Sequence, residues 1–447
     1  MRLALLATLW RGASTLSAPR QSSVARSVAV AARIDDVVRT ARTAARSCAA
    51  LGIALSLATA APQVTCAAAA FTAEQRLAAE AWHETDHLFF DRTFNGVDWF
   101  GERTGLLKAK AADADAGRAN VVAMIGRLGD KYTRYIAPDA YERLVAATLG
   151  DAAFVAGAGV QMVDGLEGAV DVVDVEPGAP ADEAGLRAGD RILAVAGFGV
   201  ADGAGAARAF RGEAGTQVTV SFARNGDVAN PIKATINRRI VELSSVRVAS
   251  VGSTDVIRIR NFAFDTPQKV SDLAPSVVSK RPLILDLRGN GGGSLEGGIG
   301  VARLFLKQGE RVVTVVDKRG APFTYDAVED GALTSRRGVA PTLVLVDGNT
   351  ASAAEVLTAA LQQNKAATVF GAAHTFGKGV IQSVQPLGDP PGIDGAVAVT
   401  VAKYVTPSGD DINGRGVLAD AVVVCGFGDS AADCLKRAPG TLLATSN

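Results

Sequence analysis

Between residues 241 and 424 the sequence alternates between strand-like and helix-like segments. Two segments have the apolar spacing of helices, Gly297–Leu306 and Ala353–Gln363. Short apolar runs predict strands at Val256–Arg260, Pro282–Leu287, Val312–Val316, Thr342–Val346, Thr368–Gly371 and Ala396–Tyr404. This alternation limits the possible folds, because elements in this order pack as helices against a sheet. It predicts a βα-alternating core with one main sheet over residues 241–447.

Two regions with different patterns precede this core. Across residues 71–150 apolar residues recur at helical spacings, which predicts a helical N-terminal domain. Across residues 154–240 short alternating strands are separated by glycine turns, which predicts a β-rich domain. We therefore expect an α/β multi-domain protein.

Residues 1–70 have the composition of a bipartite targeting segment. They contain eight Arg, no Lys and two acidic residues, a net charge of +6, whereas the whole chain is neutral. Residues 1–46 are typical of an organelle transit peptide, and the apolar run Cys48–Ala61 followed by Cys66–Ala70 is typical of a secretory signal. Two successive signals predict passage into the chloroplast thylakoid lumen. A single uncleaved N-terminal anchor is the alternative.

The remainder of the chain carries a net charge of −6. An anionic body repels phosphate, so we expect no nucleic-acid partner. No later segment reaches the length of apolar sequence that spans a bilayer. The mature chain is therefore expected to be soluble, or peripheral at the thylakoid membrane.

Ser352 lies between a predicted buried strand, Leu343–Val346, and the predicted helix Ala353–Gln363. Asn349 and Thr350 are the expected helix caps. At such a junction, free backbone N–H groups and the positive end of the helix favour developing negative charge. This position suits a serine nucleophile.

Lys378 follows Ser352 by 26 residues. A serine hydroxyl is a poor nucleophile until a base removes its proton, and a neutral lysine can be that base. A free lysine has a pKa of about 10.4, so burial must lower the pKa substantially. Phe376, Val380 and Ile381 supply apolar surroundings. The two residues predict acyl transfer by a Ser/Lys pair.

The β-rich region resembles a PDZ domain in Pro177–Ala181 and Ala184–Ile192. Such domains bind an extended C-terminal peptide by strand addition, and backbone N–H groups of a glycine-rich loop hold its carboxylate. The matching loop consists of Gly157, Ala158, Gly159 and Val160.

Three motifs of the core resemble the C-terminal processing peptidases, also called tail-specific proteases: Asp286–Gly293, Ser352–Glu355 and Thr375–Gly379. The resemblance extends from about residue 75 to 425, in the family's order of helical cap, PDZ domain and core. It implies a crotonase/ClpP-like peptidase core that needs no cofactor. One residue more than the family usually has lies between the serine and the lysine, within Gly371–Thr375.

The same resemblance implies the role of each site residue. Ser352 would be the nucleophile and Lys378 the general base, with Gln382 helping to orient the lysine amine. The N–H groups of Gly293 and Ala353 would form the oxyanion hole. Glycines suit this role because the missing Cβ lets backbone N–H groups approach the intermediate.

Trp99 and Gly129–Arg134, together with the targeting region, resemble the photosynthetic branch of this family. That branch trims the C-terminal extension from the precursor of the photosystem II reaction-centre D1 subunit. The resemblance implies this precursor as the partner; other lumenal proteins are the alternative.

Two histidine-based readings compete with the Ser/Lys pair. His83, Glu84 and His87 fit the H-E-x-x-H zinc pattern, but a third ligand is lacking, since His374 is distant and Glu102 is closer than usual. A solvated polar helix face is simpler, so we expect no metal. His374 could also serve as a base, but no orienting carboxylate is evident.

The remaining motifs favour structural roles. Asp286–Ser294 lacks the spacing of a nucleotide-binding loop. Asp286 and Arg288 are expected to form an internal polar pair, and Glu355 to be structural. A non-catalytic PDZ scaffold with a degenerate core stays an alternative from a different class.

Cys425 and Cys434 are the cysteines that follow the targeting segment. They could form a disulfide, but their separation alone does not decide this.

Overall fold

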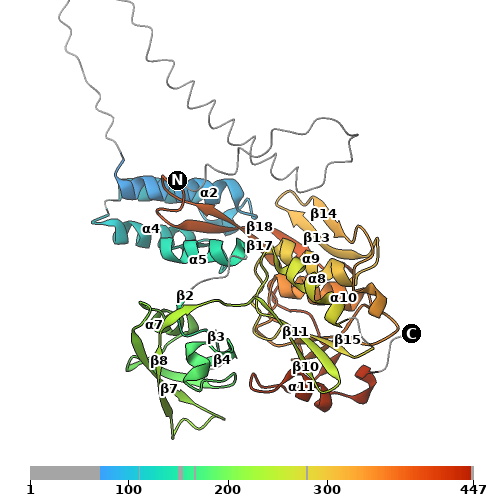
Figure 1. Ribbon diagram of the computed structural model, residues 1–447. Helices are drawn as coiled ribbons and strands as arrows, with labels where there is room; N and C mark the ends of the chain where they lie inside the picture. The colour runs from blue at the N-terminus through green and yellow to red at the C-terminus, as the bar shows by residue number, and fades with distance from the viewer. Residues whose placement is uncertain (1–70, 110, 150–154, 166–167, 278–279, 444–447) are drawn as a thin grey trace, which may run out of the picture. The chain divides into compact units, whose positions relative to one another are not determined.

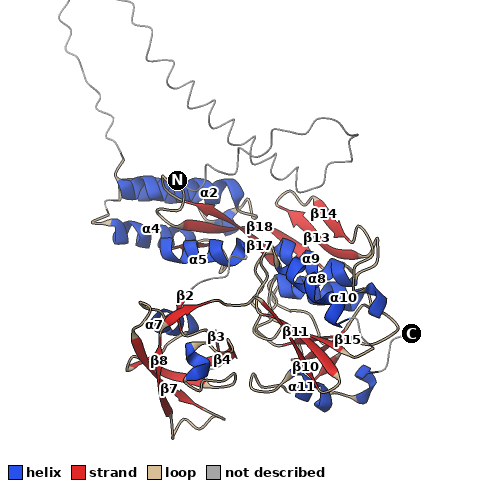
Figure 2. Cartoon of the chain, viewed as in Figure 1, coloured by secondary structure: helices blue, strands red, loops and turns tan. Residues whose placement is uncertain are grey.

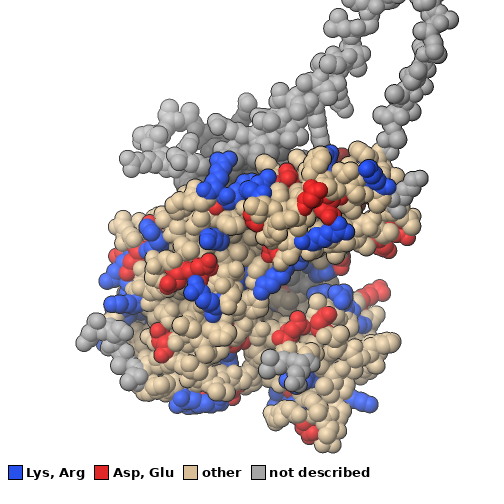
Figure 3. Space-filling model, turned by 180° about the vertical axis from the view of Figure 1, so that it is seen from behind, with Lys and Arg blue, Asp and Glu red and all other residues tan. Residues whose placement is uncertain are grey.

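A computed structural model describes residues 71–109, 111–149, 155–165, 168–277 and 280–443 (Figure 1). The targeting segment predicted at residues 1–70 lies outside the described residues. No helix in the described ranges combines the length and apolarity needed to cross a membrane. On the face shown in Figure 3, basic and acidic side chains are interspersed.

In the described chain, four α-helices precede the β-rich region: α2 (Ala73–Leu88), α3 (Trp99–Lys108), α4 (Ala114–Gly126) and α5 (Pro138–Leu149). The first three begin at side chains that accept a first-turn amide, those of Thr72, Asp98 and Asp113. Their buried faces share one apolar cluster with Val397 and Val399 of the C-terminal core. The helical region is therefore packed on that core.

Residues 155–241 contain a six-stranded sheet in the order β3-β4-β5-β7-β8, with β6 paired to β5. Its strands are β3 (Val160–Asp164), β4 (Val170–Val175), β5 (Arg191–Val195), β6 (Phe198–Gly199), β7 (Gln217–Ala223) and β8 (Ile232–Asn237). The region also holds helices α6 (Pro180–Glu183) and α7 (Gly203–Phe210), and β2 (Val155–Gly157) paired with β9 (Arg239–Val241). Strand β3 lies at the sheet edge, so one side of it keeps unpaired main-chain groups.

The main sheet of the core has the order β10-β11-β12-β15-β16-β19. Its strands are β10 (Val246–Val251), β11 (Thr254–Ile259), β12 (Leu283–Asp286), β15 (Thr342–Val346), β16 (Thr368–Gly371) and β19 (Ala421–Val422). The core helices are α8 (Thr266–Val277), α9 (Leu295–Phe305), α10 (Ala353–Gln363) and α11 (Ala431–Arg437) (Figure 2). From β11 onward the strands are parallel, and the middle strands are buried on both faces.

Alternate residues of these strands pack against different helices. Leu285 and Val344 belong to the apolar cluster that contains residues of α8, α9 and α10. Ile284 and Leu343 belong to a cluster with α11. Helices thus cover both faces of the sheet.

A second sheet was not predicted. It has the order β1-β18-β13-β14, with β17 also paired to β18. Its strands are β1 (Arg134–Ile136), β13 (Arg311–Asp317), β14 (Pro322–Asp326), β17 (Val380–Pro386) and β18 (Ala396–Val405). The prediction of one main sheet was therefore wrong, because apolar runs mark strands without showing which strands pair.

Short 3₁₀ turns complete the described chain: η1 (Phe94–Gly96), η3 (Thr334–Arg336) and η4 (Gly440–Leu443). Near the end of the chain a disulfide joins Cys425 to Cys434, whose Cα atoms are 5.7 Å apart. The sequence left open whether these two cysteines form a disulfide, and the structure shows that they do.

Candidate active site

Ser352 is the residue from which α10 starts, directly after β15 and a short turn. Its φ is +57°, a left-handed value that a serine adopts only where its surroundings impose it. The predicted caps were wrong. The helix is capped by Ser352 itself. The Thr350 hydroxyl accepts a hydrogen bond from the Asp347 amide (3.0 Å) and donates one to the Leu287 carbonyl (2.9 Å), so it orders the turn before the helix.

A glycine loop between β12 and α9 lies against the serine. A Cβ built on Gly292 would lie 2.8 Å from Ser352 Cβ, and one on Gly293 would overlap the Phe262 carbonyl. The loop is fixed because the Phe262 amide donates to the Gly292 carbonyl (2.9 Å). Only glycine fits this close approach.

The two amides predicted for the oxyanion hole come from this loop and from the helix start. Within the described residues, neither the Gly293 nor the Ala353 amide donates a hydrogen bond to another protein group. Ala353 is the first residue of α10, where backbone N–H groups have no partner within the helix. Both amides are therefore available to an incoming oxygen.

Lys378 and Ser352 line one cavity of about 680 Å³. The pKa of the Lys378 amine is lowered to about 8, chiefly by burial and next by the nearby Arg134 guanidinium. The carboxylates of Glu355 and Asp130 partly offset this by raising the pKa of Lys378. A substantial fraction of this amine is therefore neutral near pH 8, as a general base requires.

Glu355 connects the serine to the lysine loop. It is fully buried and accepts hydrogen bonds from the amides of Ser352 (2.8 Å), Gly377 (2.7 Å) and Lys378 (2.8 Å). The Thr375 hydroxyl donates to the same carboxylate at 2.5 Å. Glu355 was expected to be structural; its role in holding the two loops together was missed. The sequence signal for this role was the position of Glu355 one turn inside the helix that begins at Ser352.

Tyr404 was also missed. Its hydroxyl donates to the Ser352 carbonyl (3.2 Å) and contacts the Lys378 carbonyl. Burial raises the pKa of Tyr404 well above its ordinary value, so the phenol stays protonated and can donate. It provides a second connection between the serine and the lysine segment.

Gln382 lines the same cavity. Its side-chain amide donates to the Thr400 hydroxyl at 3.3 Å, and Thr400 in turn donates to Asp130 at 2.6 Å. The predicted orienting contact from Gln382 to Lys378 is absent among the hydrogen bonds of the described residues. Gln382 is instead linked by hydrogen bonds through Thr400 to Asp130 of the helical region.

The predicted tail-binding loop lines a different cavity, of about 90 Å³. Gly157–Val160 forms one wall, and Met162 of β3 and Phe210 of α7 contribute to others. Gly159 has φ +74°, and a Cβ there would collide with Ala179, so glycine is required.

None of the three histidines lines the Ser352 cavity. His83 and His87 are exposed one turn apart on α2, and the described residues contain no group of three or more potential ligands that could hold a metal ion. His374 is exposed, in the loop Gly371–Thr375. Its Nδ1 lies 2.8 Å from the Thr375 carbonyl oxygen, and it does not line the Ser352 cavity.

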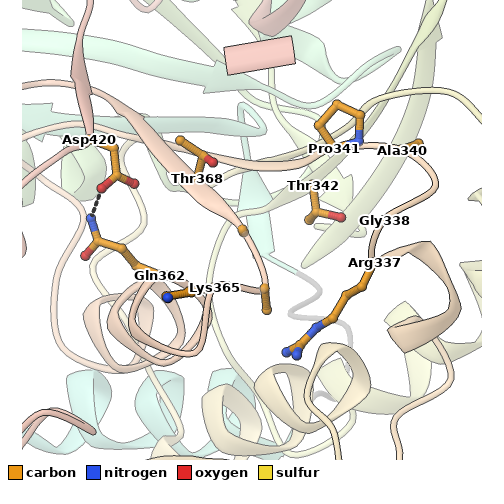
Figure 4. Close-up of a pocket in the computed structure, with 11 residues that line it drawn as sticks. Arg337, Gly338, Ala340, Pro341, Thr342, Gln362, Lys365, Thr368 and Asp420 are labelled. Atoms are coloured by element: carbon orange, nitrogen blue, oxygen red, sulfur yellow. Dashed lines mark hydrogen bonds between the residues drawn. The ribbon is translucent and has the colours of Figure 1, made fainter. Parts of the chain in front are cut away.

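Asp286 and Arg288 form the predicted internal pair, with Nη2 2.7 Å from Oδ2. A further cavity, of about 240 Å³, lies at the end of α10 opposite Ser352 (Figure 4). There Gln362 donates to Asp420 at 2.9 Å. This cavity contains neither member of the Ser/Lys pair.

The fold and the Ser352 cavity are those expected of a serine peptidase that carries a PDZ domain. Comparisons with known proteins agree. The model of peptidase family S41 matches residues 253–423, and that of the PDZ domain matches residues 172–224.

Relatives that match most of this chain narrow the assignment within serine peptidases. The chain is 35% identical over 382 residues to the chloroplastic C-terminal processing peptidase of Tetradesmus obliquus, covering 79% of this chain and 78% of that protein. It is 36% identical over 372 residues to the carboxyl-terminal-processing protease of a Picosynechococcus strain, covering 80% and 84%. The solved structure of a photosystem II D1 C-terminal processing protease matches with TM-score 0.61 and 32% identity, over 84% of this chain and 100% of that one.

This chain therefore belongs to the C-terminal processing peptidases of family S41. The predicted resemblance, the multi-domain α/β fold and the enzyme class are confirmed.

Proposed function

We propose that this chain cleaves the C-terminal tails of proteins by acyl transfer through Ser352 and Lys378. The Ser352 hydroxyl attacks the scissile carbonyl carbon while the neutral Lys378 amine takes its proton. The amides of Gly293 and Ala353 stabilise the resulting oxyanion. The C–N bond then breaks, the Lys378 ammonium protonates the leaving amine, and water releases the acyl group by the same route.

The observation that carries this proposal is the placement of Lys378 in the same cavity as Ser352. Its amine lines the cavity of Ser352 and has its pKa lowered to about 8. Glu355 holds the backbone on both sides of the pair through the Ser352 and Lys378 amides. A lysine whose pKa is lowered by burial in a cavity is a candidate general base, so the environment of Lys378 supports this role.

The tail itself would be held by Gly157, Ala158, Gly159 and Val160, beside the edge strand β3. A free sheet edge with a glycine loop at its start suits the addition of an extended peptide. Binding the tail in one region and cutting in another would select substrates by their C-termini.

The substrate that we propose is the precursor of the photosystem II D1 subunit, in the thylakoid lumen. The similar solved structure is named for D1 processing, and the Tetradesmus relative is named chloroplastic. Residues 1–70 would be a bipartite targeting segment, followed by the helical, PDZ and peptidase regions at 71–150, 154–240 and 241–447. Other lumenal proteins are the alternative substrates.

Cleavage of peptides that carry the D1 precursor C-terminus tests the proposal. Ser352→Ala and Lys378→Ala should each abolish cleavage, whereas Lys365→Ala, an exposed lysine at the other end of α10, should not. Cleavage that survives Lys378→Ala but not His374→Ala would reassign the base. A fluorophosphonate probe that fails to label Ser352 would favour the PDZ scaffold instead.

A further inference from the structure

The Lys378 amine has few contacts that could hold it beside Ser352. Within the described ranges it donates no hydrogen bond and has no carboxylate within ion-pair distance. It does lie against the ring of Tyr132, whose centroid is 5.3 Å from the lysine Nζ. A lysine ammonium within about 6 Å of an aromatic centroid is attracted by the negative face of the ring. The ring therefore supplies an attraction that a carboxylate or an amide would otherwise provide.

The segment that carries Tyr132 is fixed to the core. The Asp130 carboxylate accepts hydrogen bonds from the Tyr132 amide (3.0 Å) and the Thr133 hydroxyl (2.7 Å). The same carboxylate and the same hydroxyl also accept hydrogen bonds from Thr400 of β18, at 2.6 Å and 3.0 Å. Strand β17, which begins just after Lys378, pairs with β18. The ring and the amine are thus both held from β18.

The ring of Tyr132, and not its hydroxyl, makes this contact. The hydroxyl is buried and has no hydrogen-bond partner in the described chain. A buried hydroxyl without a partner costs free energy, so it gives no reason for a tyrosine at this position. Tyr132 also does not line the Ser352 cavity. Any effect of this residue on the reaction therefore passes through Lys378.

A second cation shares the ring. Lys131 Nζ lies 4.9 Å from the centroid of Tyr132 and 5.3 Å from that of Phe376. The Lys131 side chain is exposed, and a cation–π contact is weaker where water solvates the ammonium. Burial removes part of that water from Lys378. The attraction of the ring is therefore stronger for Lys378 than for Lys131.

Charged and titratable groups of other elements face the same amine. Arg134 of β1 lowers the pKa of Lys378, whereas Glu355 of α10 and Asp130 raise it. Tyr404 of β18 contacts the Lys378 carbonyl, but burial raises the pKa of this phenol, which stays uncharged. None of these groups makes a hydrogen bond or an ion pair with the amine in the described chain.

We propose that Tyr132 is a positioning residue whose ring face holds the Lys378 ammonium beside Ser352 between the two proton transfers. This inference rests on the proposed Ser/Lys mechanism and deepens it. The amine takes a proton from Ser352 and gives one to the leaving amine, so each cycle passes through the ammonium. Burial alone disfavours that state. The ring favours it without a hydrogen-bonded carboxylate, which would retain the proton.

The test replaces Tyr132 in the full chain by phenylalanine and by a monofluorinated, a difluorinated and a trifluorinated phenylalanine. Fluorine withdraws π density while the ring keeps its shape, so the attraction for a cation weakens with each fluorine. The pKa of the Lys378 amine is read from the NMR chemical shift of its ¹³C-labelled Cε, with Lys378→Arg assigning the resonance. This pKa should fall stepwise, by about 0.5–1 pH unit from phenylalanine to the trifluorinated ring, because the ring favours the ammonium.

Tyr132→Phe keeps the ring and removes a hydroxyl that has no partner, so the amine pKa and kcat/KM should stay close to those of the unmodified chain. The matched control is the same fluorinated series at Tyr325 of β14. That half-buried ring packs against Phe323 and does not line the Ser352 cavity. Fluorination there should leave the Lys378 pKa unchanged, and thermal unfolding of each variant verifies folding.

The pH dependence of kcat/KM for tail-peptide cleavage separates the two claims. A midpoint that falls together with the amine pKa supports both. If the amine pKa falls while the midpoint stays, Lys378 is not the base, and the proposed mechanism fails while the Tyr132 assignment stands. An amine pKa that does not change on fluorination would overturn the inference. So would a loss of kcat/KM in Tyr132→Phe as large as that in Tyr132→Leu, because the hydroxyl would then be the active group.

Discussion

The geometry of Ser352 and Lys378 depends on a buried carboxylate. Glu355 accepts four hydrogen bonds, three of them from backbone amides that belong to the two loops carrying the pair. The Ser-x-x-Glu spacing of a capping box predicts the bond from the Ser352 amide. No motif predicts the bonds from the lysine loop, because that loop is 20 or more residues away along the chain. Sequence reasoning selected Ser352 and Lys378 as the proposed reactive pair by residue type and order, but it did not find the residue that holds their two loops together.

Glu355→Gln should therefore impair both stability and turnover. The neutral amide retains one acceptor oxygen but places an NH₂ group against backbone donors, which we expect to cost about 1–3 kcal/mol of unfolding free energy. Misplacement of the pair should lower kcat about a hundredfold. Chemical denaturation and peptide cleavage measure the two effects. Glu242→Gln, at an exposed carboxylate, should change neither, and an unaffected kcat in Glu355→Gln would refute the positioning role.

Gly293→Ala tests the oxyanion loop. The new methyl group would overlap the Phe262 carbonyl, and φ +129° is unfavourable for alanine. Displacing this amide should lower kcat about a hundredfold to a thousandfold with a smaller change in KM. Gly338→Ala is the control for a glycine with positive φ outside the site, where a Cβ meets no atom. Equal kcat values in the two variants would argue against the oxyanion role.

At the scale of elements, strongly apolar segments were the most predictable. Helix α10 and strand β15 have the predicted bounds, because each is a continuous buried segment with clear ends. Helix α8 was not predicted, and it contains Pro275 in its interior. Helix α7 was not predicted either, because its sequence is rich in glycine, which disfavours helix. Pairing was the harder problem: β13 and β18 were recognised as strands but assigned to the wrong sheet.

Strand β18 and the helical region are joined through Asp130, whose carboxylate accepts hydrogen bonds from Thr133 (2.7 Å) and Thr400 (2.6 Å). Asp130→Ala should cost about 1–3 kcal/mol of unfolding free energy, because two hydroxyls lose their partner. It also removes a carboxylate that raises the pKa of Lys378, so the pKa of that amine should fall. The pH–rate profile should then shift to lower pH. A shift to higher pH would contradict this electrostatic account.

At the scale of the whole molecule, the proposed sites of recognition and of chemistry lie in different regions. The Gly157–Val160 loop and Ser352 line separate cavities. The sequence predicted this division through motif order alone, since each motif belongs to its own fold.

Separate sites make a kinetic prediction for substrates. Amidating the C-terminus of a cleavable peptide should raise KM about tenfold and leave kcat unchanged, because the carboxylate binds equally in the ground state and the transition state. Steady-state cleavage of acid and amide peptides measures this. A fall in kcat with unchanged KM would mean that tail binding instead controls the chemical step.

The central claim is that a neutral Lys378 amine activates Ser352, and the pH dependence of kcat/KM for tail-peptide cleavage tests it most directly. Because the base must be unprotonated, kcat/KM should rise with pH through an apparent pKa of about 8 and fall tenfold per pH unit well below it. Arg134→Gln should move this midpoint to higher pH, since a cation that lowers the pKa is removed. A profile that is flat, or that has its midpoint near the ordinary histidine pKa of about 6.5, would contradict the account.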